Sequence, residues 1–195
     1  MGHGNYIAPP PAQRVVGKGE KLELSYLVLP GESRTIDLSV DLAGEGAEFA
    51  LKICYVLGAE ENVNIRICVH HSAPHCKSSQ IINGVAGGKA CVSFDGRIIV
   101  APGADGTDAS QTNHNILLSD TSKVSTTPQL EIYADDVKCS HGATIGKLNE
   151  DELFYMRSRG IPESEAKLMQ TLSFLSPALD SEVTPELEEA VREIM

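Results

Sequence analysis

The chain contains no tryptophan, and phenylalanine and tyrosine together make up only 5% of its 195 residues. A core without large aromatic anchors has to be built from valine, isoleucine, leucine and alanine. Apolar residues supply 42% of the chain, which is an ordinary share for a globular protein. The length corresponds to one domain, or to one domain with an appendage.

A basic excess is also missing. The formal net charge is −11, which argues against a nucleic-acid partner because phosphate binding needs lysine and arginine. No apolar run reaches the roughly 20 residues of a membrane-spanning helix, and the first residues lack the apolar core of a signal peptide. We therefore expect a cytoplasmic chain without a membrane partner. Its five cysteines, an odd number, are expected to be reduced thiols.

Residues 15–147 show short strand patterns and almost no helical period. Residues 35–42 alternate strictly between apolar and polar, and 62–69 place valine and isoleucine on one face. Turn pairs such as Pro30-Gly31 and Asp95-Gly96 separate the runs. The other predicted strands are 22–29, 49–55, 80–86, 89–94, 97–100, 115–118, 129–133 and 136–145.

These strands begin every 10 to 14 residues or so, which is typical of an all-β sandwich, a barrel or a β-solenoid. Small and polar residues recur at strand ends, and the strands are too short and too many for a simple meander, which favours the solenoid. No sequence repeat is visible. The pattern therefore leaves the solenoid and the sandwich open. The recurring asparagines are Asn62, Asn64, Asn83, Asn113, Asn115 and Asn149.

Three parts of the chain follow from these patterns. Residues 1–14, with three consecutive prolines, form a flexible lead, 15–147 form the β core, and 148–195 form a small helical subdomain. Asn149 and Glu152 predict a capped helix start, and Gly160 predicts its end. Pro162 is predicted at the first position of a second helix, and Thr184-Pro185 opens a third. Their apolar stripes need cover, from one another or from a partner.

Two groups of thiols and imidazoles could carry chemistry. The first places five potential ligands within nine residues, and zinc and iron favour these ligand types. Its spacing matches no structural zinc motif, and exposed histidines are common in turns, so a purely structural reading stays open. The five residues are Cys68, His70, His71, His75 and Cys76.

The second group is the pair Cys139 and His141. Residues two apart on a strand point the same way, so the thiol and the imidazole would project side by side. Such a pair can bind a metal, form a nucleophile with its base, or be structural. The chain has no phosphate-binding glycine loop, no Gly-x-Ser-x-Gly and no His-Glu-x-x-His, so the residues themselves do not indicate an enzyme.

The stretch around this pair resembles a known family. LEIYADDVKCSHGATIG at 130–146, followed by LFYMRSRGI at 153–161, is similar to the C-terminal signature of the SufB/SufD family of iron–sulfur cluster assembly scaffolds, and specifically to its SufD-like members. The similarity extends over residues 111–175. Between 15 and 100 the likeness is only one of style.

This resemblance implies a mainly β chain: a right-handed parallel β-helix followed by a small C-terminal helical subdomain. It also implies a non-catalytic scaffold subunit that pairs with a SufB-like scaffold and docks a SufC-like ABC ATPase. Cys139 and His141 match the positions that lie at the interface of the two scaffolds, where cluster assembly is thought to occur. Iron or an iron–sulfur cluster would bind there transiently. The sequence does not decide whether flavin binds.

The resemblance also assigns the helices after Gly146 to ATPase docking. Family members are about twice as long and carry an N-terminal helical domain, so this chain is either a minimal form or a fragment. The scaffold could also pair with itself through two-fold symmetry. The alternative functions are an autonomous metal-binding or metal-sensing module using Cys68–Cys76, and a cysteine enzyme using Cys139. The docking candidates are Leu153, Phe154, Arg157, Leu168 and Leu172.

Overall fold

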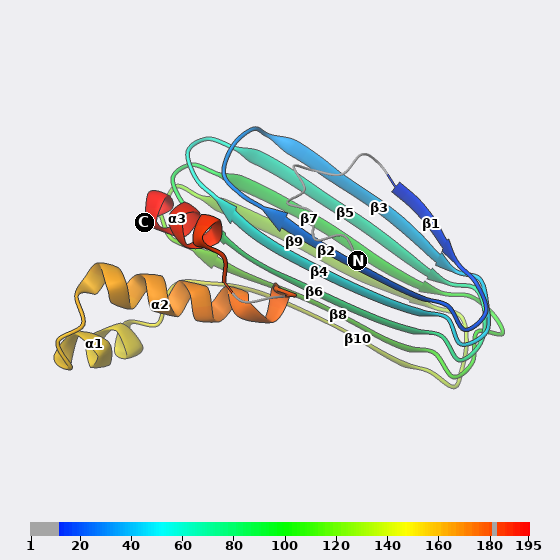
Figure 1. Ribbon diagram of the computed structural model, residues 1–195. Helices are drawn as coiled ribbons and strands as arrows, with labels where there is room; N and C mark the ends of the chain where they lie inside the picture. The colour runs from blue at the N-terminus through cyan, green and yellow to red at the C-terminus, as the bar shows by residue number, and fades with distance from the viewer. Residues whose placement is uncertain (1–11, 181–182) are drawn as a thin grey trace.

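The computed structural model describes residues 12–180 and 183–195, so most of the expected N-terminal lead lies outside the described residues. The described chain is mainly β, with a helical segment at its C-terminal end (Figure 1). The strands are β1 (Ala12–Val16), β2 (Lys21–Val28), β3 (Arg34–Leu42), β4 (Glu48–Leu57), β5 (Asn62–His71), β6 (Lys77–Ala86), β7 (Cys91–Val100), β8 (Asp108–Leu117), β9 (Lys123–Ile132) and β10 (Lys138–Gly146).

Consecutive strands lie in opposite sheets. The odd-numbered strands form one five-stranded sheet in the order β1-β3-β5-β7-β9, and the even-numbered strands form the other, β10-β8-β6-β4-β2. Every neighbouring pair is parallel. The chain therefore winds as a β-solenoid of about five turns (Figure 1). This arrangement excludes the sandwich and confirms the parallel β-helix that the resemblance implied.

The turns are in register although their lengths differ. Ala12 pairs with Leu38, 26 positions later, whereas Cys91 pairs with Lys123, 32 positions later. The extra residues are taken up at the corners, so the inward positions of each strand still stack. This uneven period explains why no repeat is visible in the sequence.

The apolar phase of each strand faces the space between the sheets. In one column, Ile36 pairs with Ile65 and Ile65 pairs with Phe94, and all three side chains are buried. Each such side chain stabilises the fold by about 1.5–3 kcal/mol relative to leaving it in water. Stacked columns of aliphatic side chains thus form the core that the tryptophan-free composition predicted.

Several strands run beyond their predicted limits, and two of them show why. β7 continues through Asp95-Gly96, which was predicted as a turn; a side chain at Gly96 would collide with Phe94 and Gln111 inside the solenoid. β8 begins at Asp108 rather than 115, because its inward positions Gln111 and Asn113 are polar and hide the alternation. The alternation of apolar residues did not predict these two segments, because their inward-facing residues are small or polar.

The helices are α1 (Glu150–Ser158), α2 (Glu163–Leu175) and α3 (Pro185–Ile194), with a 3₁₀ turn η1 (Ser176–Ala178). The side chain of Asn149 accepts hydrogen bonds from the backbone N–H groups of Asp151 and Glu152, so the predicted cap is confirmed. Gly160 follows α1 with φ of +87°, as a helix stop requires. Pro162 precedes α2 as its N-cap, one position earlier than predicted.

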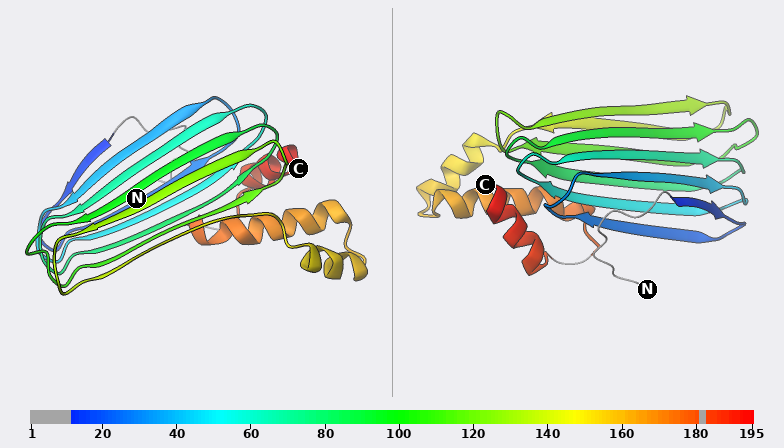
Figure 2. Two further views of the ribbon diagram at one scale, coloured as in Figure 1. Left: turned by 180° about the vertical axis from the view of Figure 1, so that it is seen from behind. Right: turned by 90° about the horizontal axis from the view of Figure 1, so that it is seen from above.

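The helical segment packs on the outer face of the even-numbered sheet (Figure 2). Leu168, Leu175 and Leu187 bury against the outward side chains of β4, β6 and β8. The side-chain amide of Asn83 donates to the carbonyl of Phe174 at 2.8 Å. The apolar stripes of the tail are therefore covered within the chain, while α1 lies beyond the ends of the strands (Figures 1 and 2). None of the described helices is long and apolar enough to cross a membrane.

We predict that Gly84→Ala destabilises the solenoid strongly. A Cβ at this position would lie 2.1 Å from the ring of Tyr55, which crosses Gly84 to donate its hydroxyl to Asn115. Overpacking of this kind costs about 1–3 kcal/mol, to be measured by urea unfolding. Gly142→Ala in β10 is the matched control, because a Cβ there meets nothing within 4 Å. Equal stability of the two variants would contradict the prediction.

Candidate functional site

The last turn of the solenoid has open strand edges. Within the described residues, β9 pairs only with β7 and β10 only with β8. Each therefore presents a row of unpaired backbone N–H and C=O groups, which can pair with another chain. β10 has a single charged residue, Lys138, whereas β9 has a proline, Pro128, in its middle. Charge and proline discourage added strands, so β10 is the more receptive edge.

Apolar side chains accompany these edges. Ile132 is 42% exposed at the end of β9 and Tyr133 follows it at 61%. Ile145, near the other end of β10, is 45% exposed. A strand edge with a single charged residue and exposed apolar residues at both ends has the character of a protein interface.

Cys139 lies on β10 and faces the interior of the solenoid. It pairs with the buried Ala109 and packs against a cluster that includes Ile98 and Val100. The thiol is half-buried. Burial, together with the nearby carboxylate of Asp108, raises the pKa of this thiol above its ordinary value. The isolated chain therefore holds Cys139 as a neutral thiol, which does not favour a nucleophilic cysteine enzyme.

His141 lies two residues further along β10 and so projects to the same side as Cys139. Its side chain is exposed, and it makes no hydrogen bond or ion pair within the described part of the chain. The strand register places it over Gln111 of β8. The thiol and the imidazole that the sequence singled out are thus neighbours on the open turn, as predicted.

The Cys68–Cys76 group is divided between different surfaces. Cys68 and His70 lie on the outer face of β5, where the His70 ring shares a 2.9 Å hydrogen bond with Ser72. His71 points inward, is fully buried, and shares a 2.9 Å hydrogen bond with Ser78. Across residues 12–180 and 183–195, no group of three or more His, Cys, Asp or Glu residues could hold a metal ion.

The remaining two members serve the turn between β5 and β6. His75 has φ of +58°, and its N–H donates to the Asp105 carbonyl. Gly46 and Gly106 hold the equivalent positions in the adjacent turns and also have positive φ. The Cys76 thiol is buried and donates to the Gly44 carbonyl at 3.2 Å. His75 and Cys76 therefore have a structural role in the stacked corners of the solenoid.

The five docking candidates fall into two classes. Leu153 and Leu168 are 3% exposed, and Leu172 packs with the same core under α2, so these three hold the helical segment together. Phe154 is 72% exposed on α1. Arg157, also on α1, forms a 3.6 Å ion pair with Glu163 at the surface. Tyr155 and Met169 are also exposed, although the sequence pattern did not single them out as docking residues.

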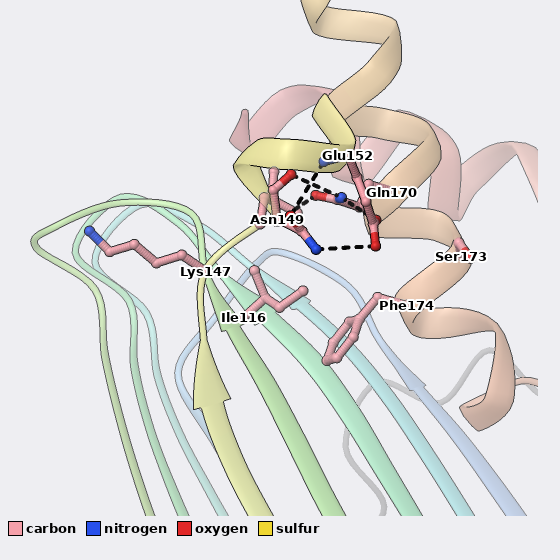
Figure 3. A pocket seen from close by; sticks show the side chains of 8 residues that line it. Ile116, Lys147, Asn149, Glu152, Gln170, Ser173 and Phe174 are labelled. Carbon is pink, nitrogen blue, oxygen red and sulfur yellow. Dashed lines mark hydrogen bonds between the residues drawn. The ribbon is translucent and has the colours of Figure 1, made fainter. Parts of the chain in front are cut away.

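A cleft of about 280 Å³ lies where α1 and α2 meet the end of β8 (Figure 3). Its polar walls are bonded to one another: the Gln170 amide donates to Glu152 at 2.7 Å, and the Asn149 amide donates to the same carboxylate at 3.2 Å. Ile116 and Phe174 supply the apolar wall. The cleft therefore belongs to the contact between the helices and the solenoid.

Comparison with known proteins agrees with this architecture. The model of the family described as SUF system FeS cluster assembly, SufBD core domain, matches residues 12–174. The chain belongs to this SufBD family. The match begins about 100 residues before residue 111, where the recognised similarity starts. Residues 15–100 are therefore part of the family domain as well.

Three relatives indicate the branch and the extent of the match. The iron-sulfur cluster assembly protein SufD of Escherichia coli K12 is 37% identical over 155 residues, which cover 80% of this chain and 34% of that protein. A SufBD family protein of Synechocystis is 37% identical over 127 residues, covering 65% and 28%. One of Mycobacterium bovis is 28% identical over 182 residues, covering 89% and 46%. The chain thus matches between 28% and 46% of the length of these relatives.

The sequence analysis also missed a buried polar row beneath the open turn. Gln80, Gln111, Asn113 and Asn115 are each no more than 2% exposed, although they occupy inward positions of β6 and β8. The Gln111 amide donates to the Gln80 side-chain oxygen at 2.9 Å. The strand register places Gln80, Gln111 and His141 in one column. The sequence does not show this column, because its members are 31 and then 30 positions apart.

We predict that His71 makes the fold sensitive to acid. Burial, together with the nearby His70, lowers the pKa of its imidazole to about 4 from an ordinary value of 6.5. Below pH 6.5 the unfolded chain takes up a proton that the folded chain refuses, so the free energy of unfolding falls as the pH drops toward 4. This contribution is about 2 kcal/mol between pH 7 and pH 4.5.

Urea unfolding of wild type and His71→Asn across this pH range measures the contribution. The variant should lose much of the acid-dependent decrease, because asparagine keeps a polar group near Ser78 without a titrating ring. His114→Asn, on the outer face of β8, is the matched control and should keep the wild-type slope. The same slope in wild type and His71→Asn would contradict the prediction.

Proposed function

We propose that this chain is a SufD-type, non-catalytic scaffold subunit of the SUF machinery for iron–sulfur cluster assembly, acting in the cytosol. The observation that carries the proposal is the open turn of the solenoid, which bears Cys139 and His141 side by side on an unpaired strand edge with one charged residue. The family match supports the assembly role. A cluster, or the iron that enters it, is the cargo at this edge.

A SufB-like scaffold is the proposed partner of this edge. Pairing along β10 would satisfy its open backbone groups and cover Ile132, Tyr133 and Ile145. It would also place ligands from the partner next to Cys139 and His141, because two protein ligands alone do not complete a metal or cluster site. A second copy of this chain could use the same edge through two-fold symmetry.

The α1–α2 segment is the proposed docking surface for a SufC-like ATPase. Its buried leucines fix it on the solenoid, while Phe154 and Tyr155 of α1 and Met169 of α2 remain exposed. Exposed aromatic side chains of this kind are frequent anchors in protein interfaces. The alternative of an autonomous metal-binding module finds no support in the described residues, since Cys68–Cys76 do not converge.

Co-expression of the chain with a SufB-like scaffold and a SufC-like ATPase tests the proposal as a whole. We expect a stable complex of the three proteins on size-exclusion chromatography. A well-folded chain that associates with neither protein would refute the scaffold function. Association with the scaffold but not the ATPase would refute only the docking surface.

We predict that Cys139→Ser and His141→Ala each leave the fold intact and impair cluster assembly. Cys139 is only partly buried and His141 is exposed at the open turn, and serine keeps nearly the size of cysteine, so the two replacements cost little packing. In cells that depend on this protein, the activity of iron–sulfur enzymes under iron limitation should fall by about tenfold, the effect of losing about 1.4 kcal/mol at the site. Cys68→Ser, on the outer face of the other sheet, is the control. Normal growth of both site variants would show that these residues do not serve assembly.

We also predict that Phe154→Asp weakens ATPase binding without changing the free energy of unfolding. The ring is 72% exposed, so it contributes to docking rather than to the core. Loss of an aromatic anchor typically weakens an interface by 2 kcal/mol or more, about thirtyfold in Kd. Val15→Asp is the matched control, because Val15 is 71% exposed on β1, far from α1. Unchanged affinity of Phe154→Asp in titration calorimetry would exclude this surface.

A further inference from the structure

We propose that Gln111 positions His141: its buried side-chain oxygen accepts a hydrogen bond from one imidazole nitrogen and leaves the other nitrogen free for a ligand. For its consequence in cluster assembly this inference rests on the proposed function. The hydrogen bond itself does not. It follows from the register, the burial of Gln111 and the unused atom on its amide.

The register brings the two side chains together. His141 and Gln111 are direct partners on adjacent strands, which are about 4.8 Å apart in a sheet. Gln111 points into the solenoid, because its side chain is 1% exposed. Cys139, two residues before His141, packs inward against Ile98 and Ala109, so His141 projects on that inward side as well.

The amide of Gln111 is held in one orientation with one atom to spare. Its nitrogen donates to the Gln80 oxygen at 2.9 Å. Its oxygen is fully buried and has no hydrogen-bond partner. This oxygen lies against Gly96 of the opposite sheet, where even a Cβ would approach it to 2.4 Å. A buried oxygen without a partner costs about 1–3 kcal/mol, so a donor that reaches it is favoured.

His141 is the donor that suits this atom. Asn113 also carries an unpartnered buried atom, but that atom is a nitrogen and the residue above it is Ala143, which has no acceptor. The imidazole of His141 has no partner within the described residues. Gln111 is the register partner of His141, so a hydrogen bond from the imidazole to the spare oxygen would satisfy both groups within the chain itself.

The consequence is a fixed tautomer. In a neutral imidazole one nitrogen carries the proton and the other is the acceptor or metal ligand, and the hydrogen bond at the first decides which is which. Gln111 thus acts as a positioning residue that turns His141 toward a ligand on the open side of β10. It does not touch that ligand itself.

Nitrogen-15 NMR of the histidine rings in the whole chain tests the hydrogen bond directly. At pH 8 we expect one protonated ring nitrogen to dominate at His141 in wild type. In Gln111→Met, which keeps the volume but removes the acceptor, the tautomer ratio should change by about fivefold, equivalent to one hydrogen bond of about 1 kcal/mol. Gln129→Met, on the outer face of β9, is the matched control and should leave His141 unchanged.

His114 serves as the internal standard, because its ring is hydrogen-bonded to Thr144 on the outer face of β8 and β10. If Gln111→Met fails to fold, Gln111→Asn, whose shorter amide cannot reach the ring, replaces it. An identical His141 tautomer ratio in wild type and in the folded variant would overturn the inference. A changed ratio together with normal cluster assembly in His141→Ala cells would instead refute the proposed function and leave the hydrogen bond in place.

Discussion

Backbone hydrogen bonds between parallel strands of successive turns hold this solenoid together, and every turn relies on the next one to complete them. In the described chain, each inner strand is paired on both sides, whereas β9 and β10 are paired on one side only. The same geometry stacks equivalent side chains into columns, such as Ile36, Ile65 and Phe94 in the core. The fold therefore ends in a surface that is ready to pair with another chain.

The candidate site is a direct consequence of that ending. Inward positions that would be buried one turn earlier are open at β10, so Cys139 is half-buried and His141 is exposed. The column beneath His141 is polar at Gln80 and Gln111, whereas a column of the other sheet, such as Ile36, Ile65 and Phe94, is apolar. Buried polar side chains destabilise a solenoid unless they are hydrogen-bonded. At the open end of the column, a further side chain can supply the missing hydrogen bond.

The sequence predicted the strand phase, the helix caps and the Cys139–His141 neighbourhood, because local periodicity and capping decide them. It could not choose between solenoid and sandwich, because turns of 26 to 32 residues conceal the repeat. The first half of β8 was not predicted because its inward residues are polar. Gly96 was predicted as part of a turn, although in the strand it leaves space for Phe94 and Gln111. The grouping of Cys68 with His71 failed because residues an odd number of positions apart on a strand face opposite sides of the sheet.

Hydrogen–deuterium exchange on the chain, alone and with a SufB-like scaffold, tests most directly whether the open turn is the assembly surface. Addition of the partner should slow exchange at the backbone amides of residues 138–146 in β10, because pairing closes the open edge. Exchange in β2, the far edge of the same sheet, should not change. Protection of β2 with no change in β10, in a complex that does form, would contradict the account.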